Sequence, residues 1–262
     1  MTLGTISPDG QFYWNGAQWQ STQSVDGAWR WTGTDWVPIA AAPYSSPRSL
    51  GIVVSVLLAV SVATTLISTF VFEFYFHISY YVAGDEVVIY SIDLGGLVIF
   101  VVAAAFFLVW FHRSYRNLTS LGAQDLPIAA DWAIGWWFVP VASLWMPFVA
   151  ASEIWRGSDP NAPAITSADS RHAAGPAVLV TFWWAMWIIS IVLVNVASVF
   201  VYPADNQWVL PVLSAAATAL AGALAVAFVV SSSARENARW RRLLSPTSTP
   251  VMAAAPIVSS SI

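Results

Sequence analysis

Residues 50–72 read LGIVVSVLLAVSVATTLISTFVF, a run of 23 residues without a charged side chain. At about 1.5 Å per residue, a helix of this length crosses a hydrocarbon core of about 30 Å. Three further uncharged stretches, at 94–111, 178–202 and 209–231, have the same character. The sequence therefore predicts an all-α polytopic membrane domain with four transmembrane helices.

The overall composition supports a membrane protein and excludes several kinds of chemistry. Hydrophobic residues make up 58% of the chain and charged residues only 9%, far below the roughly 25% charged content of soluble domains. The absence of cysteine removes disulfides, thiolate catalysis and Cys-ligated zinc. A net charge of -4 leaves no basic stripe for a nucleic acid. The three histidines are scattered, and no phosphate loop or dinucleotide glycine pattern is present, so we expect neither a metal site nor a cofactor.

A fifth apolar segment, 132–152, decides the topology. If it crosses the membrane, six of the ten arginines fall outside the cell, which inverts the positive-inside rule. If it does not cross, all ten are cytoplasmic. Pro140 and Pro147 interrupt its helical hydrogen bonding, and tryptophans such as Trp132 and Trp136 favour the membrane interface. The sequence predicts a broken re-entrant or interfacial helix, with both chain termini cytoplasmic in a multi-pass plasma-membrane protein.

A tandem repeat precedes the first span. Residues 7–20 and 24–37 match with a period of 17, beginning with Ser7-Pro8-Asp9-Gly10 against Ser24-Val25-Asp26-Gly27. Asp-Gly and Asn-Gly pairs favour tight hairpin turns, and the residues between them are short aromatic runs. The repeat therefore predicts a small β-meander at 1–37. Its tryptophans are Trp14, Trp19, Trp29, Trp31 and Trp36.

Two interpretations of these tryptophans stay open. The rings could form a miniature core, because so small a module has little else to bury. They could also form an exposed groove for a proline-rich peptide from a partner or from the proline-rich linker at 38–49. The membrane domain then covers 50–244, and the Ser, Thr, Pro and Ala content of 245–262 predicts a disordered tail.

Polar residues gather where the second span and the broken segment reach the cytoplasmic edge. The candidate ring consists of Arg113, Arg116, Asn117, Asp131, Glu153 and Arg156. Charge close to a membrane core is costly unless paired, so one interpretation is a set of ion pairs that tie the broken segment to the second span. The other is a polar cavity beneath Pro140 and Pro147 that binds a lipid headgroup or a small anion through Arg113, Arg116 and Arg156.

Residues 110–160 resemble a bacterial membrane family known as domain of unknown function 4328. The matching positions are Trp110, Arg116-Asn117-Leu118, Trp132-Ala133-Ile134-Gly135-Trp136, Pro140, Pro147 and Glu153-Ile154-Trp155. The resemblance covers roughly 50–240, although the family usually has an asparagine near Ser143 and a basic residue near Met146. The N-terminal repeat is similar to the tryptophan-rich modules of actinobacterial proteins called domain of unknown function 2510. Neither resemblance implies a biochemical activity.

Three classes of function follow from these features. The leading hypothesis is a non-enzymatic membrane anchor or scaffold whose aromatic module recruits a cytoplasmic protein, with membrane lipids around it and self-association into a homo-oligomer left open. The second is a transporter, channel or lipid-binding protein that uses the broken helix. An intramembrane enzyme comes third, because the residues supply no nucleophile, base and orienting group together.

Overall fold

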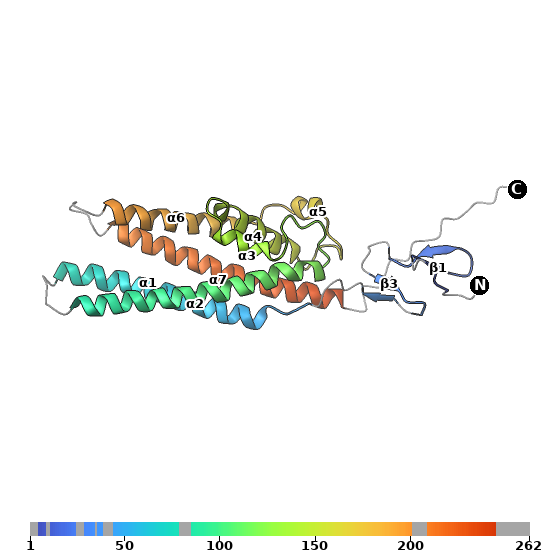
Figure 1. Ribbon diagram of the computed structural model, residues 1–262, viewed down its shortest axis with the longest axis horizontal. Helices are drawn as coiled ribbons and strands as arrows, with labels where there is room; N and C mark the ends of the chain where they lie inside the picture. The colour runs from blue at the N-terminus through green and yellow to red at the C-terminus, as the bar shows by residue number, and fades with distance from the viewer. Residues whose placement is uncertain are drawn as a thin grey trace.

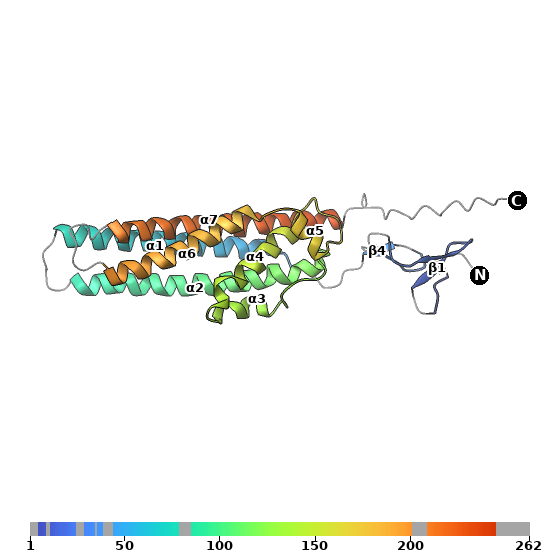
Figure 2. The same ribbon diagram turned by 90° about the horizontal axis from the view of Figure 1, so that it is seen from above.

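The computed structural model describes residues 5–8, 11–24, 29–34, 36–38, 44–78, 85–200 and 209–244. Four long helices form an elongated bundle: α1 (Arg48–Ile78), α2 (Asp85–Ser120), α6 (Val178–Phe200) and α7 (Val209–Leu243). Helix α1 packs against α2 and α7, and α6 packs against α7 (Figures 1 and 2). All four are long and apolar enough to cross a membrane, which confirms the predicted fold class.

The helices are longer than the uncharged stretches that predicted them. Helices α2 and α7 contain 36 and 35 residues, whereas about 20 suffice to cross the hydrocarbon core. The start of α1, the end of α7 and α5 all lie at the same end of the bundle (Figure 1). Close packing of α1 on α7 needs a glycine at Gly222, where an added Cβ would lie 2.3 Å from a Val62 methyl group.

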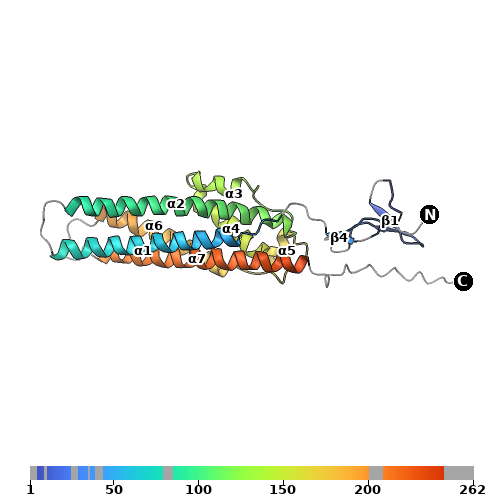
Figure 3. The same cartoon turned by 90° about the horizontal axis from the view of Figure 1, so that it is seen from below.

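The broken segment lies against α2 and α6 and is sharply bent. It contains α3 (Trp132–Gly135), η1 (Trp136–Phe138), η2 (Ala142–Leu144) and α4 (Met146–Gly157), and the two halves meet at 111° (Figure 3). Pro140 lies at the bend, and Val141 next to it has a φ of 69°, which is rare for a β-branched residue. Pro147 has a different role, because it occupies the first turn of α4, where proline is well tolerated.

Aromatic rings fill the space between the broken segment and the long helices. Trp137 makes edge contacts at 5.8 Å with both Phe107 and Phe111 of α2. Trp183 of α6 stacks on Phe228 of α7 at 5.2 Å. The indole of Trp184 donates a hydrogen bond of 3.0 Å to the Leu144 carbonyl, so it satisfies one backbone group that the broken helix leaves unpaired.

The N-terminal module consists of two hairpins. Strands β1 (Phe12–Trp14) and β2 (Trp19–Ser21) form one two-stranded sheet, and β3 (Trp29–Trp31) and β4 (Trp36–Pro38) form the other. Antiparallel bridges link Ile6 to Tyr13 and Gln23 to Arg30. Each bridge therefore pairs a residue of the preceding segment with the first strand of a hairpin. Thr22 joins the repeats, because its amide donates to the Gln11 carbonyl of the first hairpin and its carbonyl accepts from the Trp31 amide of the second.

The period of 17 is visible in individual hydrogen bonds. The hydroxyl of Ser7 accepts from the Phe12 amide at 3.0 Å, and the hydroxyl of Ser24 accepts from the Trp29 amide at 2.9 Å. Gly16 and Gly33 turn the two hairpins with φ values of 99° and 104°, a region that glycine occupies without strain. The two repeats thus have the same local structure.

Candidate functional site

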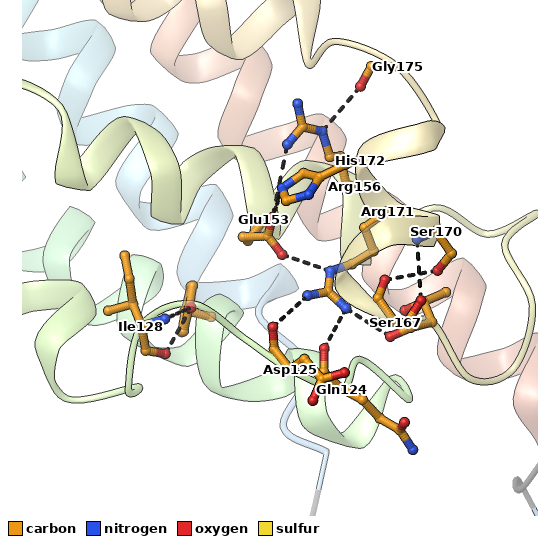
Figure 4. A network of polar contacts seen from close by, with 12 residues as sticks. Gln124, Asp125, Ile128, Glu153, Arg156, Ser167, Ser170, Arg171, His172 and Gly175 are labelled. Carbon is orange, nitrogen blue, oxygen red and sulfur yellow. Dashed lines mark hydrogen bonds and ion pairs between the residues drawn. The ribbon is translucent and has the colours of Figure 1, made fainter.

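Glu153 is the centre of a buried polar cluster at the end of the bundle that holds α5. Its carboxylate accepts a bond of 2.7 Å from Arg171 Nε, and both side chains are 1% exposed. Arg156 Nη1 lies 3.9 Å from the same carboxylate, and His172 Nε2 lies 3.4 Å away. Figure 4 shows these three basic side chains, from α4 and α5, around one carboxylate. The geometry is that of a structural ion-pair network.

Arg171, on the short helix α5 (Ala168–Ala173), also fixes a backbone loop. It donates to the carbonyls of Gln124 at 2.7 Å, Thr166 at 2.8 Å and Asp125 at 3.3 Å (Figure 4). These carbonyls belong to the two loops that follow α2 and α4. A bridge between Ala123 and Thr166 joins the same loops. Arg171 therefore ties α4, α5 and the loop after α2 into one unit.

Arg239 of α7 also binds backbone carbonyls of the loops that follow α2 and α4. Its side chain is fully buried and donates to the carbonyls of Leu121 at 2.9 Å, Asp159 at 2.8 Å and Pro163 at 2.8 Å. A planar guanidinium with five N–H donors suits such a task better than a lysine ammonium. One turn earlier, Arg235 lies over the Trp155 ring at 4.3 Å. Helix α7 is thus attached to the end of the broken segment.

A second polar cluster joins the linker to the bundle. Asn117 of α2 donates to the Ser45 carbonyl at 2.8 Å and to Glu236 of α7 at 2.9 Å. The Tyr44 hydroxyl donates to Asn237 at 2.9 Å, and its ring stacks on Trp240. Burial and the nearby Glu236 carboxyl raise the pKa of Tyr44 above its usual range, so the hydroxyl keeps its proton. The linker is therefore bound to α2 and α7 just before α1 begins.

The residues of the predicted ring are distributed over several places. Glu153 and Arg156 meet, but Asn117 belongs to the linker cluster. Asp131 pairs with His112 at 3.3 Å on the surface. Arg113 and Arg116 make no ion pair or side-chain hydrogen bond with the described part of the chain. The structure thus shows no single cavity lined by Arg113, Arg116 and Arg156, because Arg156 is held by Glu153 and the Gly175 carbonyl.

The broken-helix residues mostly pack against each other. Trp132 contacts Trp136 at 4.9 Å, and an added Cβ at Gly135 would lie 2.8 Å from the Trp132 ring. Pro147 is buried at the start of α4. At the bend beside Pro140, four side chains are more than two-fifths exposed: Phe138, Val141, Leu144 and Trp145. This apolar tip points away from the protein, as expected for a segment surrounded by lipid.

In the aromatic module, a tyrosine rather than a tryptophan is the central ring. Tyr13 is 7% exposed and packs against Trp31 with ring centroids 5.4 Å apart, across the two repeats. Trp14 meets Trp19 edge-on at 5.8 Å. Trp29 and Trp36 lie in the second hairpin, on β3 and β4. Trp19 and Phe12 remain 39% and 43% exposed.

The sequence did not predict the buried polar contacts of Arg171, Glu236 and Arg239. The available signal was weak: all ten Lys and Arg positions are arginine, and Glu236 interrupts a run of arginines at the end of α7. Among the described residues, no three His, Asp or Glu side chains lie close enough together to share a metal ion.

The arrangement of spans, broken segment and polar cluster can be compared with known families. The family model described as "Domain of unknown function (DUF4328)" matches residues 79–238, more than half of the chain. The chain belongs to the DUF4328 family. The match is narrower than the expected 50–240, because it begins after α1. Within DUF4328 it includes the bent pair, the Glu153 cluster and most of α7. No curated protein and no solved structure matches the chain.

Proposed function

We propose that this DUF4328 protein is a non-enzymatic membrane anchor that presents its aromatic module to a partner protein. The observation that carries the proposal is the exposure of Phe12 and Trp19, at 43% and 39%, on a module with very few residues. Such a module has a strong need to bury its rings. Two large rings left in contact with solvent therefore support a binding surface.

The bonding of the linker is consistent with presentation of the module. Tyr44, Ser45 and Ser46 are bonded to α2 and α7, so the chain that leads to the module is fixed where it meets the bundle. Two buried arginines support the non-enzymatic part of the proposal. Arg171 and Arg239 use their donors on backbone carbonyls, which makes them structural rather than catalytic.

The partner that fits the surface is a proline-rich segment of a membrane-associated or cytoplasmic protein. Proline rings pack on exposed aromatic rings, and an extended proline-rich chain loses little entropy on binding. The proposal includes the likeness of residues 7–37 to domain of unknown function 2510, which lies outside the DUF4328 match. It also places both termini in the cytoplasm, where such a partner would meet the module.

The test uses the full-length protein in detergent and a labelled proline-rich peptide. We expect fluorescence anisotropy to show binding that Trp19→Ala and Phe12→Ala weaken at least tenfold. The matched control is Trp145→Ala, because Trp145 is 49% exposed on the broken segment and far along the chain from the module. Binding that Trp145→Ala weakens as much as Trp19→Ala, or no binding at all, would reject the proline-rich partner.

A second candidate function, recognition of an anionic lipid headgroup, is favoured by Arg113 and Arg116. These arginines continue an exposed apolar stripe of α2 formed by Val102, Phe106 and Val109, with the spacing of one helix face. Arginines at the end of a lipid-facing stripe are placed to reach headgroup phosphates.

This candidate predicts that anionic lipid is retained by the parent and lost by Arg113→Gln/Arg116→Gln. Native mass spectrometry of protein from mixed anionic and zwitterionic nanodiscs measures the retention. Arg30→Gln is the control, since Arg30 is exposed on the module. Equal retention of both lipid classes by the parent would reject this candidate.

A further inference from the structure

Glu236 is a fully buried carboxyl group without a basic partner. Its side chain is 0% exposed on α7, and no ion pair to it forms within the described residues. Oε2 accepts from the Asn117 amide at 2.9 Å. Oε1 is buried and has no hydrogen-bond partner. A carboxyl group that is buried without a counter-charge is costly unless it is neutralised.

Two buried serine hydroxyls on the elements around this carboxyl group also lack a partner of good hydrogen-bond geometry. Ser114 of α2 lies beside Glu236, yet its buried hydroxyl makes no hydrogen bond of normal geometry. Ser232 lies one helical turn before Glu236 on the same face of α7, and its hydroxyl is likewise buried without a partner. Buried polar groups are nearly always paired in folded proteins. Oε1 of Glu236 and the adjacent Ser114 hydroxyl, with the Ser232 hydroxyl on the same face of α7, are therefore poorly satisfied oxygens, and they suggest an occupant.

The charged groups of the surrounding elements do not supply that occupant. On α7, Arg235 is held by Trp155, and Arg239 by three carbonyls. On α4, Glu153 and Arg156 bond to each other and to α5 and the loop after it. The Tyr44 hydroxyl of the linker bonds to Asn237, and His112 of α2 pairs with Asp131. Arg48 of α1 is exposed, and Arg113 and Arg116 of α2 make no ion pair with a described residue.

We propose that Glu236, Ser114 and Ser232 form a buried site for a small monovalent cation, a proton or a sodium ion. Either occupant would remove the unfavourable lone negative charge. A proton on Oε1 would let the carboxyl group donate to the Ser114 hydroxyl, which pairs two of the three oxygens. A sodium ion would be bound by Oε1 and the hydroxyl oxygens, the type of ligand that hard cations prefer.

The site goes beyond the anchor function and does not depend on it. It is built from α2 and α7 and lies next to the Asn117 bond that also fixes Ser45 of the linker. Loss of the occupant would leave a charge beside this bond. The failure of this proposal would leave the aromatic module and its partner unaffected.

The experiment measures the purified full-length protein in two ways. The first is the Tm in sodium chloride against choline chloride at equal ionic strength. The second is the infrared difference spectrum between the parent and Glu236→Gln, which isolates the C=O stretch of one carboxylic acid. Glu236→Gln keeps the shape of the side chain and the acceptor for Asn117. Ser190→Ala is the control for Ser114→Ala, because buried Ser190 has a satisfied hydroxyl on α6.

Sodium binding predicts a higher Tm in sodium that Glu236→Gln abolishes and Ser114→Ala reduces, while Ser190→Ala keeps it. Proton binding predicts no effect of sodium and a carboxylic-acid band near neutral pH that Glu236→Gln removes. Ser114→Ala should then shift this band, because the hydrogen bond to the hydroxyl is lost. The proposal is overturned if sodium has no effect and the acid band is missing, or if a sodium effect persists in Glu236→Gln.

Discussion

Glu153 on α4 and Arg171 on α5 lie 18 residues apart in the chain and form an ion pair of 2.7 Å in which each side chain is 1% exposed. Because the guanidinium also holds three backbone carbonyls, this pair links the broken segment to two loops. The pair is therefore more than a local contact, and its removal should affect the whole end of the bundle.

Replacement of either partner should destabilise the protein strongly. Glu153→Ala leaves the buried Arg171 guanidinium without a counter-charge, and Arg171→Ala leaves Glu153 with only its longer contacts to Arg156 and His172. We expect each to cost about 3 to 5 kcal/mol in the free energy of unfolding. The double variant should lose less than the sum, because the two residues interact directly. Denaturation of the four proteins in detergent gives the coupling energy.

A second cycle with Arg156 is the matched comparison. Arg156 lies 3.9 Å from Glu153 and is 20% exposed, so solvent screens this pair more. We expect a smaller coupling energy than for Arg171. Equal coupling in both cycles would contradict the structural ranking.

Arg239→Lys should be destabilising even though the charge is kept. The three carbonyls that Arg239 binds require a planar fork of donors, which an ammonium group on a shorter side chain cannot replace. Unpaired buried carbonyls should lower the free energy of unfolding by about 2 kcal/mol or more. Arg241→Lys is the control, because Arg241 is exposed and lies two residues further along α7. Similar Tm values for the two variants would show that the carbonyl bonds contribute little.

The loop after α2 should depend on a glycine at position 122. Gly122 has a φ of 85°, and an added Cβ would lie 1.9 Å from the Ala164 carbonyl oxygen. Gly175 has a φ of 93° but open space around it, so it isolates the conformational effect. We expect Gly175→Ala to cost about 1 kcal/mol and Gly122→Ala at least about 3 kcal/mol. Equal thermal stability of the two variants would contradict the close contact.

Both termini should be cytoplasmic. Four spans return the chain to its starting side, and the positive-inside rule places that side in the cytoplasm. Reporter fusions after Ile262 and before Met1 measure this: a reporter active only outside the cytoplasm should stay inactive at both ends, while a cytoplasmic reporter should be active. Activity of the external reporter at the C-terminus would mean that the bent segment crosses the membrane.

The spans and the break could be predicted because their signals are local. Uncharged length defines a span, and Pro140 marks the bend within a few residues. The repeat with a period of 17 likewise predicted two equivalent hairpins. Each of these features can be recognised in one short window of sequence.

The polar contacts could be predicted only in part. Glu153 and Arg156 share a helix face, so their proximity follows from spacing, but the closer partner of Glu153 is Arg171 on another element. Arg239 bonds to carbonyls about 80 residues away, and a backbone carbonyl leaves no mark in the sequence. Glu236 has four arginines close to it in the sequence at the end of α7. The sequence therefore suggested ion pairs that Glu236 does not form with these arginines in the structure.

The hydrogen bonds of Arg171 and Arg239 determine which mutations the loops at this end of the bundle can tolerate. Because both side chains recognise main-chain oxygens, the loops at 121–125 and 159–166 can exchange many side chains without losing these bonds. An insertion or deletion of a single residue is different, since it would move every carbonyl out of register with a fixed guanidinium. Apart from Gly122, whose replacement brings a Cβ against the Ala164 carbonyl oxygen, mutational tolerance in this region should therefore follow loop length rather than loop composition. A deep mutational scan with single-residue indels would show the contrast.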